Sequence, residues 1–476
     1  MGSLFSALDS ASQSLQAFEQ AMDVTQNNVA NANSPGYADQ VPELVSQPFQ
    51  TGTGLTGGVQ EQTQDSRDSY ADQAVQQQLS LQGMYQQLQT SLGPLQSVFD
   101  VSSNSPIPSA LNTLFQSFSA WATQPGNASY QATVIGAAQQ VATAFQQAAT
   151  QLGNIQTDTN NDIQSTVAQI NQDAATIQSY NVAIAKNATP DAGLSAQLES
   201  TLENLSSLTN VTTLPGLGGM VTVLVGGQTP LVIGTQVNDL QAVNNTSSTA
   251  GNPGAAPTIS IVDSNGNDVT SEVTSGSLAG LLNVSNTVLP SLIGGGQQVG
   301  GLNTLAEGLA NSVNNVLEQA STTSTPPYQS GSPLFTYNSS LPAGIAGTLA
   351  VSSTITGSQL AAADTGPPVV ANGAALTLAG LDSSNPGPVD GQGFTQYFSS
   401  MASSVGNAAA SATTSASAQS QLVAQAQSLQ QQVSGVSLDE EAIRLVQLQS
   451  TYDAVGKVVT EINDTLATLM NMIPTD

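Results

Sequence analysis

Residues 3–37 read SLFSALDSASQSLQAFEQAMDVTQNNVANANSPGY, and apolar positions recur in this stretch in alternating steps of four and three. This heptad spacing predicts one helix with a continuous apolar seam, about 45 Å long at a rise of 1.5 Å per residue. Pro35 and Gly36 then suit the two central positions of a type II turn, because Gly supplies the positive φ at the second of them. The sequence therefore predicts a long N-terminal helix that ends at a tight turn. The seam residues that we expect to form an assembly interface are Leu4, Leu8, Leu15, Phe18, Met22 and Val29.

A second seam occupies the other end of the chain. Ser437 and Glu440 match a capping box, which predicts that a helix starts there. The seam residues expected to complete the assembly interface are Tyr452, Val455, Val459, Ile462, Leu466, Leu469 and Ile473. The ordinary interpretation of heptads is an internal bundle within one monomer. However, both seams lie at chain ends, and neither carries the e and g charges of a stand-alone coiled coil. These two observations favour an intermolecular coiled coil.

Helical and strand-like stretches alternate between the two seams. A 3.6-residue periodicity predicts helices at about 65–100 and 128–186, whereas runs such as 221–225 and 258–262 predict strands. Residues 38–64 are predicted to be extended or loop. The fold class is therefore α+β and multidomain, with long terminal helices that form an intermolecular coiled coil, an α-helical middle domain and a β-rich outer domain. The expected domains are an inner core of 1–37 with 437–476, a mainly helical domain of 38–210 with 276–321 and 391–436, and an outer domain of 211–275 with 322–390.

The composition is acidic and poor in charge. Charged residues make up 8% of the chain and only four are basic, so the formal net charge is -28. Because there is no basic stripe to neutralise phosphates, the composition excludes nucleic acid as a partner. The absence of Cys and His excludes disulfides, His-based catalytic triads and ordinary zinc sites. We find no apolar run long enough for a membrane span and no secretory signal at the N-terminus.

No constellation of side chains predicts an enzyme. Residues 263–268 read DSNGND and superficially match a calcium loop, but their Gly is misplaced and Thr274 stands where the bidentate Glu belongs. The Asn-Gly pair between two strand runs predicts a hairpin turn instead. Glu440 and Glu441 are explained by helix capping and by the helix dipole. We therefore expect no catalytic residue, no cofactor and no metal.

Both ends of the chain carry motifs of a known family. Residues 27–37, NNVANANSPGY, closely resemble the N-terminal signature of flagellar rod, hook and hook-associated axial proteins, and residues 433–441, VSGVSLDEE, resemble the C-terminal signature. Asp39 departs from the family pattern, which usually has a basic residue there. In the middle, residues 110–118 and 276–282 resemble the hook-associated protein 1 (FlgK) members of the family. The motif residues are Asn28, Asn31, Pro35, Gly36, Tyr37, Gly435, Leu438, Asp439, Glu440 and Glu441.

What the resemblance implies is a structural, non-enzymatic role. Proteins of this family leave the cell through the flagellar type III export channel, so the resemblance implies an extracellular protein of the hook–filament junction. The implied partners are further copies of the chain in a ring, the hook protein, a second hook-associated junction protein and through it flagellin, and an export chaperone. A hook or distal rod protein of the same family is the nearest alternative. The Ser-, Thr- and Gly-rich strand segments would also suit a secreted surface adhesin.

Overall fold

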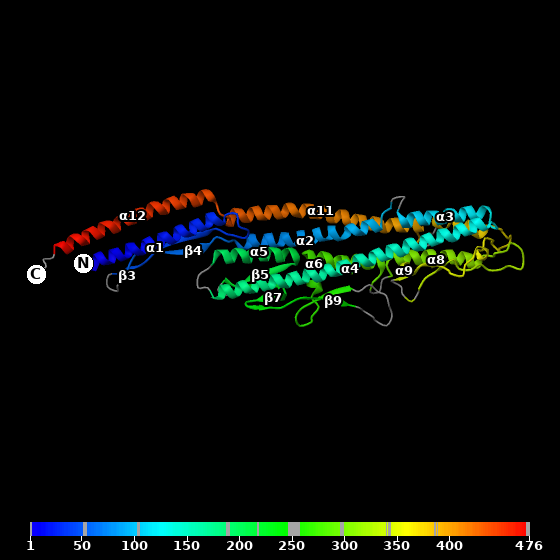
Figure 1. Cartoon of the computed structure of the whole chain (residues 1–476), viewed down its shortest axis with the longest axis horizontal. Coiled ribbons are helices and arrows are strands. Elements are labelled where there is room, and N and C mark those ends of the chain that lie inside the picture. The colour runs from blue at the N-terminus through cyan, green and yellow to red at the C-terminus, as the bar shows by residue number, and fades with distance from the viewer. Residues whose placement is uncertain are drawn as a thin grey trace.

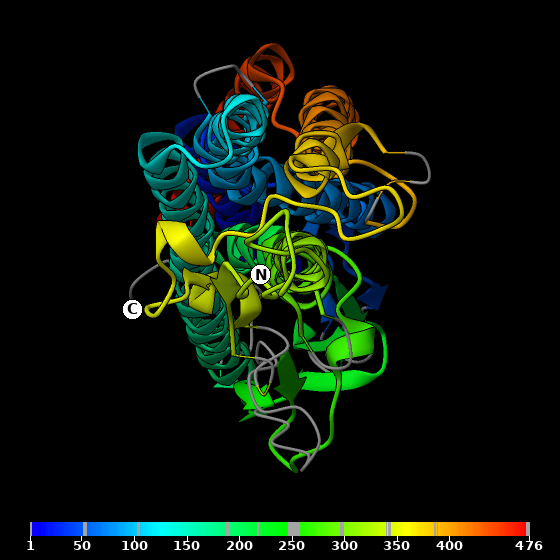
Figure 2. The same cartoon turned by 90° about the vertical axis from the view of Figure 1, so that its right-hand side faces the viewer.

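The computed structural model describes residues 2–50, 55–101, 105–186, 191–216, 219–245, 258–295, 299–338, 340, 344–384, 387 and 389–472. In this part of the chain the molecule is elongated, and the start of the first helix and the end of the last helix lie at the same end of it (Figure 1). The long helices run roughly along the long axis, as the end-on view in Figure 2 shows. The two ends of the sequence are therefore neighbours in space, as expected if they act together.

One end of the molecule is formed by the two terminal helices. Helix α1 (Gly2–Asn31) and helix α12 (Leu438–Asn471) lie side by side and run in opposite directions (Figure 1). Both bounds agree with the helices predicted from the heptad seams. Helix α12 begins where Ser437 accepts a hydrogen bond from the backbone N–H of Glu440 at 3.5 Å, so the predicted N-cap is confirmed.

A β-hairpin packs against α1. Strands β1 (Gln40–Ser46) and β4 (Val59–Asp65) pair antiparallel along their full length, and the short strands β2 (Phe49–Gln50) and β3 (Leu55–Thr56) extend the hairpin. These strands agree with the extended structure expected for 38–64, and they pack against α1 rather than among the helices of the domain to which 38–210 was assigned. The hairpin lies with the terminal helices because α1 covers one of its faces. We call α1, the hairpin and α12 the terminal module.

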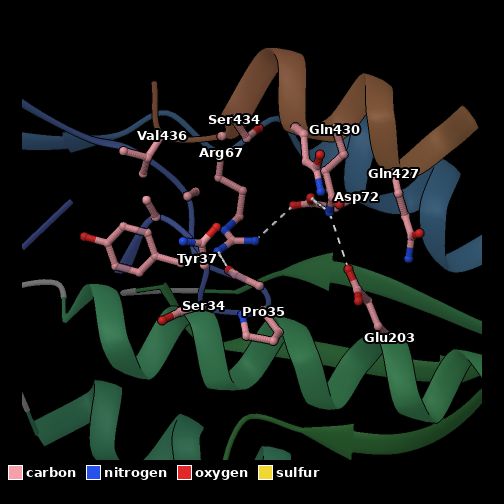
Figure 3. A pocket seen from close by; sticks show the side chains of 16 residues that line it. Ser34, Pro35, Tyr37, Arg67, Asp72, Glu203, Gln427, Gln430, Ser434 and Val436 are labelled. Atoms are coloured by element: carbon pink, nitrogen blue, oxygen red, sulfur yellow. Dashed lines mark hydrogen bonds and ion pairs between the residues drawn. The ribbon is translucent and has the colours of Figure 1, made fainter. Parts of the chain in front are cut away.

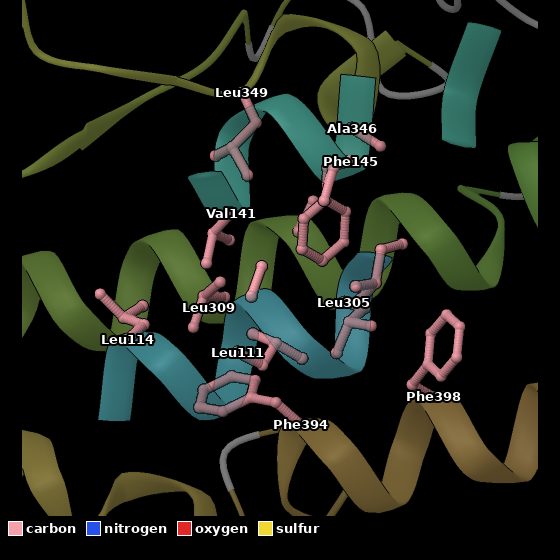
Figure 4. Close-up of a cluster of buried hydrophobic side chains, with 14 of the residues drawn as sticks. Leu111, Leu114, Val141, Phe145, Leu305, Leu309, Ala346, Leu349, Phe394 and Phe398 are labelled. Carbon is pink, nitrogen blue, oxygen red and sulfur yellow. The ribbon is translucent and has the colours of Figure 1, made fainter. Parts of the chain in front are cut away.

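A helical body follows the terminal module and surrounds the main hydrophobic core. Its long helices are α2 (Ser69–Val98), α3 (Pro106–Thr123), α4 (Ala128–Lys186), α8 (Gly301–Gln319) and α11 (Phe394–Ser434). Figure 4 shows Leu111 and Leu114 of α3, Val141 and Phe145 of α4, Leu305 and Leu309 of α8, and Phe394 and Phe398 of α11. Trp121 is fully buried in this core, and its Nε1 donates to the backbone carbonyl of Pro125 at 3.0 Å. Long helices thus hold the centre of the molecule together through apolar contact.

Helix α4 connects this core to a second one. The helix has 59 residues, about 90 Å at 1.5 Å per residue, and its second half packs on a small sheet through Ile163 and Ile177 among others. The other helices near the sheet are α5 (Ala192–Leu208), α6 (Ser277–Asn283), a π-helical turn (Val284–Val288) and α7 (Leu289–Ile293). The antiparallel sheet has the order β5 (Val211–Pro215), β6 (Val221–Val225), β7 (Thr229–Ile233), β8 (Gln236–Val237), and β9 (Gln241–Asn245) pairs with β10 (Thr258–Val262). The strands predicted at 221–225 and 258–262 are confirmed.

The suspected calcium loop is a turn. The backbone N–H of Gly266 donates to the carbonyl of Asp263 at 2.9 Å, and Gly266 has a φ of +83°. The Asp263 carboxylate accepts from Asn265 and Asn267. The Asn-Gly pair therefore makes the turn after β10, as predicted.

Residues 322–390 differ from the β-rich outer segment predicted from composition. Their described part contains two two-residue strands, β11 (Phe335–Thr336) and β12 (Ala350–Val351), and two short helices, α9 (Ile345–Thr348) and α10 (Gly373–Ala379). Short 3₁₀ turns occur at Thr270–Glu272, Gly357–Gln359 and Leu381–Ser383. Buried side chains of this segment belong to the main core of the helical body. The prolines of this segment lack a backbone N–H and interrupt any long ladder, and the segment instead follows the surface of the helices.

Candidate assembly interface

The two predicted seams meet each other within one molecule. Phe18 of α1 and Leu448 of α12 are buried at the centre of their contact, and Met22, Tyr452 and Val455 pack around them. The other predicted seam residues that are half-buried are Leu4, Leu8, Leu15, Val459, Ile462 and Leu466. Each terminal helix thus uses the opposite end of its own chain as a partner. The intermolecular coiled coil stays a prediction.

Two predicted seam residues of the described part do not join this contact. Val29 is 42% exposed and Leu469 is 37% exposed, whereas Ile473 lies outside the described residues. Near the end of α1, the neighbouring Asn28 turns inward instead of Val29. The apolar seam is therefore replaced there by a polar contact.

A further apolar face on α12 was missed by the sequence analysis. Ile443 is 60% exposed and Val446 is 67% exposed, and Val458 is also exposed. At 3.6 residues per turn the side chains of Ile443 and Val446 project away from the buried Leu448, and that of Val458 projects to one side of it. The sequence does contain a sign of this face, because these apolar residues fall outside the heptad seam. They alternate with polar residues such as Gln447, which weakens the pattern.

The exposed apolar residues continue on α11. Leu422, Leu429 and Val433 are all exposed, and spacings of seven and four place them on one side of this helix. Figure 1 shows α11 and α12 one after the other along the same edge of the molecule. The outer apolar face, as we call it, consists of Leu422, Leu429, Val433, Ile443, Val446 and Val458. Apolar side chains that are exposed along successive helices are a candidate interaction site.

The N-terminal and C-terminal motifs meet at the fully buried side chain of Asn28. Its Nδ2 donates to Asp39 Oδ1 at 2.6 Å, to the backbone carbonyl of Gln40 at 2.8 Å and to Glu441 Oε2 at 3.1 Å. Its Oδ1 accepts from the hydroxyl of Tyr37 at 2.9 Å and from the backbone N–H of Gln40 at 3.1 Å. Both polar atoms of the amide are therefore satisfied, by partners from both ends of the chain.

Charged groups surround this amide. Arg444 pairs with Glu441 and lies 4.0 Å from the carboxylate of Asp39. Burial and the nearby Glu441 raise the pKa of Asp39, while Arg444 acts in the opposite direction. Burial, followed by the charges of the neighbouring carboxylates, raises the pKa of Tyr37 to about 12. Asp39, the position that departs from the family pattern, thus has partners of its own in Asn28 and Arg444.

The turn after α1 has the predicted type. The backbone N–H of Tyr37 donates to the carbonyl of Ser34 at 3.2 Å, and Gly36 has a φ of +71°, as a type II turn requires. A Cβ on Gly36 would lie 2.4 Å from the backbone oxygen of Ala196 in α5. Only Gly therefore lets the turn rest directly on α5.

The remaining motif residues end or begin helices. The N–H of Gly435 donates to the carbonyl of Gln431 at 3.0 Å and closes the end of α11. The side-chain amide of Asn31 donates to the carbonyl one turn earlier in α1, also at 3.0 Å. The motif residues with exposed side chains are Pro35, Leu438, Asp439 and Glu440. The positions of these residues at helix ends thus account for much of the two motifs, without contact between the N-terminal and the C-terminal motif.

A cavity of about 620 Å³ lies where the Gly36 turn meets α5 and α11 (Figure 3). Arg67 reaches across it, because its Nη2 donates to the Gly36 carbonyl at 2.6 Å and its Nη1 lies 3.5 Å from Asp72 Oδ2. Gln430 of α11 donates to Asp72 Oδ1 at 2.7 Å and lies 3.5 Å from Glu203 Oε1. These polar contacts join the terminal module to the helical body.

Two kinds of site were sought in the part of the chain that the structure describes. No three His, Cys, Asp or Glu side chains are grouped there so that they could hold a metal ion. None of the described helices is both long and apolar enough to cross a membrane.

Three models of known families match the chain. The model of the flagellar hook-associated protein FlgK helical domain matches residues 92–335, just over half of the chain. The model of the flagella basal body rod protein matches residues 8–37, and that of the flagellar basal body rod FlgEFG protein C-terminal matches residues 430–472. The two terminal matches cover the helices that pair in the terminal module.

Individual relatives agree with the family models. Flagellar hook-associated protein 1 of Bacillus subtilis (strain 168) is 27% identical over 228 residues, which are 44% of this chain and 44% of that protein. The alignment therefore spans less than half of the length of this relative. The structure of the flagellar hook junction protein FlgK from Burkholderia pseudomallei matches with a TM-score of 0.64 and 16% identity, over 76% of this chain and 100% of that chain. At this identity the match shows a shared fold.

Proposed function

Since the chain belongs to the FlgK family of flagellar hook-associated proteins, we propose that it joins the flagellar hook to the filament by assembling with further copies of itself into a ring. The observation that carries this proposal is the outer apolar face on α11 and α12. Among the residues that the structure describes, its six side chains stay exposed, and the two helices that carry them follow one another along one edge of the molecule. A neighbouring copy is the partner that ring assembly would place there.

The energetics of the outer apolar face support contact with a neighbour. Covering the exposed part of one Leu, Ile or Val side chain contributes on the order of 1 kcal/mol. Helix α11 contains no charged residue in its 41 positions, and Ser, Thr, Gln and Asn fill its polar positions. Uncharged amides and hydroxyls cost less to remove from water than ions do. The face can therefore be buried against another subunit without an uncompensated charge from α11.

The seams take a different part in this proposal. The heptad seams hold α1 and α12 together, and the side of α12 that faces away from α1 contacts the next subunit. The intermolecular coiled coil would then combine paired helices from several copies rather than single unpaired helices. The family supports the remaining partners of the proposal: the hook protein, a second hook-associated junction protein and through it flagellin, and a chaperone during type III export.

The proposal is tested first by deleting the gene in the source bacterium. We expect electron microscopy to show hooks without filaments, with flagellin released into the medium. Loss of the hooks as well would indicate a hook or distal rod protein, and normal filaments would remove the chain from the flagellar axis.

Complementation then tests the outer apolar face. We expect a gene with both Ile443→Asp and Val446→Asp to leave hooks bare, because two charges would have to be buried between subunits. The control is Asn463→Asp, which adds a charge to an exposed position on another side of α12 and should restore filaments. Restored filaments with the double variant would contradict the assigned face.

A further inference from the structure

The contact between the terminal module and the helical body contains more carboxylates than cations. Arg67 lies 3.5 Å from Asp72, 3.7 Å from Glu199 and 3.9 Å from Asp65. Glu203 reaches the same cavity through Gln430. Among the ion pairs of the described residues, Arg67 is the basic partner of this group. Four carboxylates therefore share one guanidinium, which compensates one negative charge.

These five residues lie where the terminal module meets the helical body. We call Arg67, Asp65, Asp72, Glu199 and Glu203 the Arg67 cluster. The Gly36 turn follows α1 and rests on the backbone of α5 at Ala196, one turn before Glu199. Arg67 binds the carbonyl of this turn with one arm and faces Glu199 and Asp72 with the other. A change in the charge of Glu199 therefore acts, through Arg67, on the turn that follows α1.

Glu199 is a buried carboxylate of the cluster, as is Asp72. Glu199 is 6% exposed, and its Oε1 accepts from the amide of Gln76 in α2 at 2.9 Å. Burial, followed by the negative charge of Asp72, raises the pKa of Glu199 to about 7, although Gln76 and Arg67 favour its ionised form. Burial also raises the pKa of Asp72.

Every element around Glu199 contributes to its surroundings. The segment between β4 and α2 brings Arg67 and Asp65, α2 brings Asp72, α5 itself brings Glu203, and α11 brings the uncharged Gln430. Apart from Arg67, the charged groups are all acidic. A second full negative charge beside Asp72 is therefore costly in the closed contact and cheap once water enters the cavity.

We propose that the Arg67 cluster is a proton-dependent joint, in which a proton shared by its carboxylates holds the Gly36 turn against α5 and loss of that proton loosens the terminal module from the helical body. The joint sets how firmly the pair of terminal helices is oriented relative to the rest of the chain. It operates within one molecule and does not depend on ring assembly.

The direction of the effect follows from the protons bound in each state. The closed joint raises the pKa of Glu199 above its ordinary value of 4.5, so the closed form holds a proton that the open form releases. Closure is therefore favoured fully below pH 4.5, and this advantage is lost as the pH rises through about 7. If opening returns the pKa of Glu199 from about 7 to 4.5, the equilibrium constant for opening is about tenfold larger at pH 8 than at pH 6.

Hydrogen–deuterium exchange on the full chain tests the joint, with rates corrected for the intrinsic effect of pH. Peptides from 34–40 and 196–203 should show about tenfold more opening at pH 8 than at pH 6. The variant Glu199→Gln should remove this difference. The matched control is Glu318→Gln, at an exposed carboxylate of α8, which should retain it.

Two results would overturn the proposal: equal opening of the wild-type peptides at both pH values, or a pH dependence that persists in Glu199→Gln. If Glu199→Gln does not fold, the side-chain carboxyl carbons of ¹³C-labelled wild-type protein are titrated by NMR. One Glu signal with a midpoint near pH 7 is expected, and its absence would equally refute the joint.

Discussion

The side-chain amide of Asn28 lies 3.1 Å from the carboxylate of Glu441, although 413 positions separate the two residues in the chain. Asn28 belongs to the N-terminal motif and Glu441 to the C-terminal motif, and both side chains are buried. The hydrogen bonds of Asn28 connect the two motifs, because they hold the end of α1 against the start of α12 and against the hairpin. The buried amide of the N-terminal motif therefore has a hydrogen-bond partner in the C-terminal motif.

Replacement of Asn28 should open the terminal module. In Asn28→Ala the buried N–H of Gln40 and the half-buried hydroxyl of Tyr37 lose their acceptor, and each unsatisfied group costs about 1–3 kcal/mol. We expect the free energy of opening of α12, measured by hydrogen exchange on peptides around 438–448, to fall by about 3 kcal/mol. Asn27→Ala is the matched control, because Asn27 is exposed on the same helix and should change little. Equal effects of the two substitutions would show that the Asn28 contacts are unimportant.

Tyr37 should ionise late. Burial first, and then the charges of Asp39, Asp65 and Glu441, raise its pKa to about 12, whereas an exposed phenol titrates near 10. The folded state therefore keeps the proton longer, and this contribution to stability is present below pH 10 and lost as the pH rises toward 12. In an alkaline titration, the difference in phenolate absorbance between the wild type and Tyr37→Phe should have its midpoint near 12 rather than 10. A midpoint near 10 would mean that the Asn28 pocket is open to water.

The elements of this fold could be predicted where one local pattern is sufficient. The 3.6-residue periodicity of 128–186 predicts α4, and Pro35-Gly36 predicts the type II turn, because both depend on residues close together in the sequence. The contact of Asn28 with Glu441 could not be found in this way, since no local pattern tells which distant side chain satisfies a buried amide. Glu199 likewise stands in an ordinary helical pattern, and only the packed structure shows that it is buried beside Asp72.

The outer apolar face shows why a correct helix can still be misinterpreted. The heptad at Tyr452 and Val455 is the stronger pattern, and it explains the side of α12 that packs against α1. Ile443 and Val446 follow a weaker spacing interrupted by polar residues, and their exposure depends on which side α1 covers. Residues 322–390 illustrate the opposite case, because short strand-like runs were predicted to form a separate layer and instead complete the helical core.

Substitution by Ala should lower stability at Gly36 and raise it at Gly406. Gly36→Ala places a Cβ 2.4 Å from a backbone oxygen of α5 at a positive φ, so we expect the terminal module to loosen by about 2 kcal/mol or more. Gly406 lies inside α11 with open space around it, and Gly406→Ala should raise the stability of the body by about 0.5–1 kcal/mol.

Limited proteolysis of the terminal helices and thermal unfolding of the whole chain separate the two outcomes. Faster cleavage in Gly36→Ala with an unchanged body, and a higher Tm in Gly406→Ala, are expected. A stable, protease-resistant Gly36→Ala protein would show that the turn does not rest on α5 in solution.

Disruption of the seam should release the terminal helices and leave the helical body folded. Leu466 is half-buried in the seam of α12 and Leu15 in that of α1, so Leu466→Asp or Leu15→Asp places a charge in the seam, at a cost of about 1–3 kcal/mol. Trp121 reports on the body alone, because this single Trp of the chain is fully buried in the main core. We expect lower helical circular dichroism with unchanged Trp121 emission. Thr465→Asp is the control, since it adds the same charge at an exposed neighbouring position and shares any cost from the helix dipole. A red shift of Trp121 emission in Leu466→Asp would show instead that the terminal helices are needed to hold the body together.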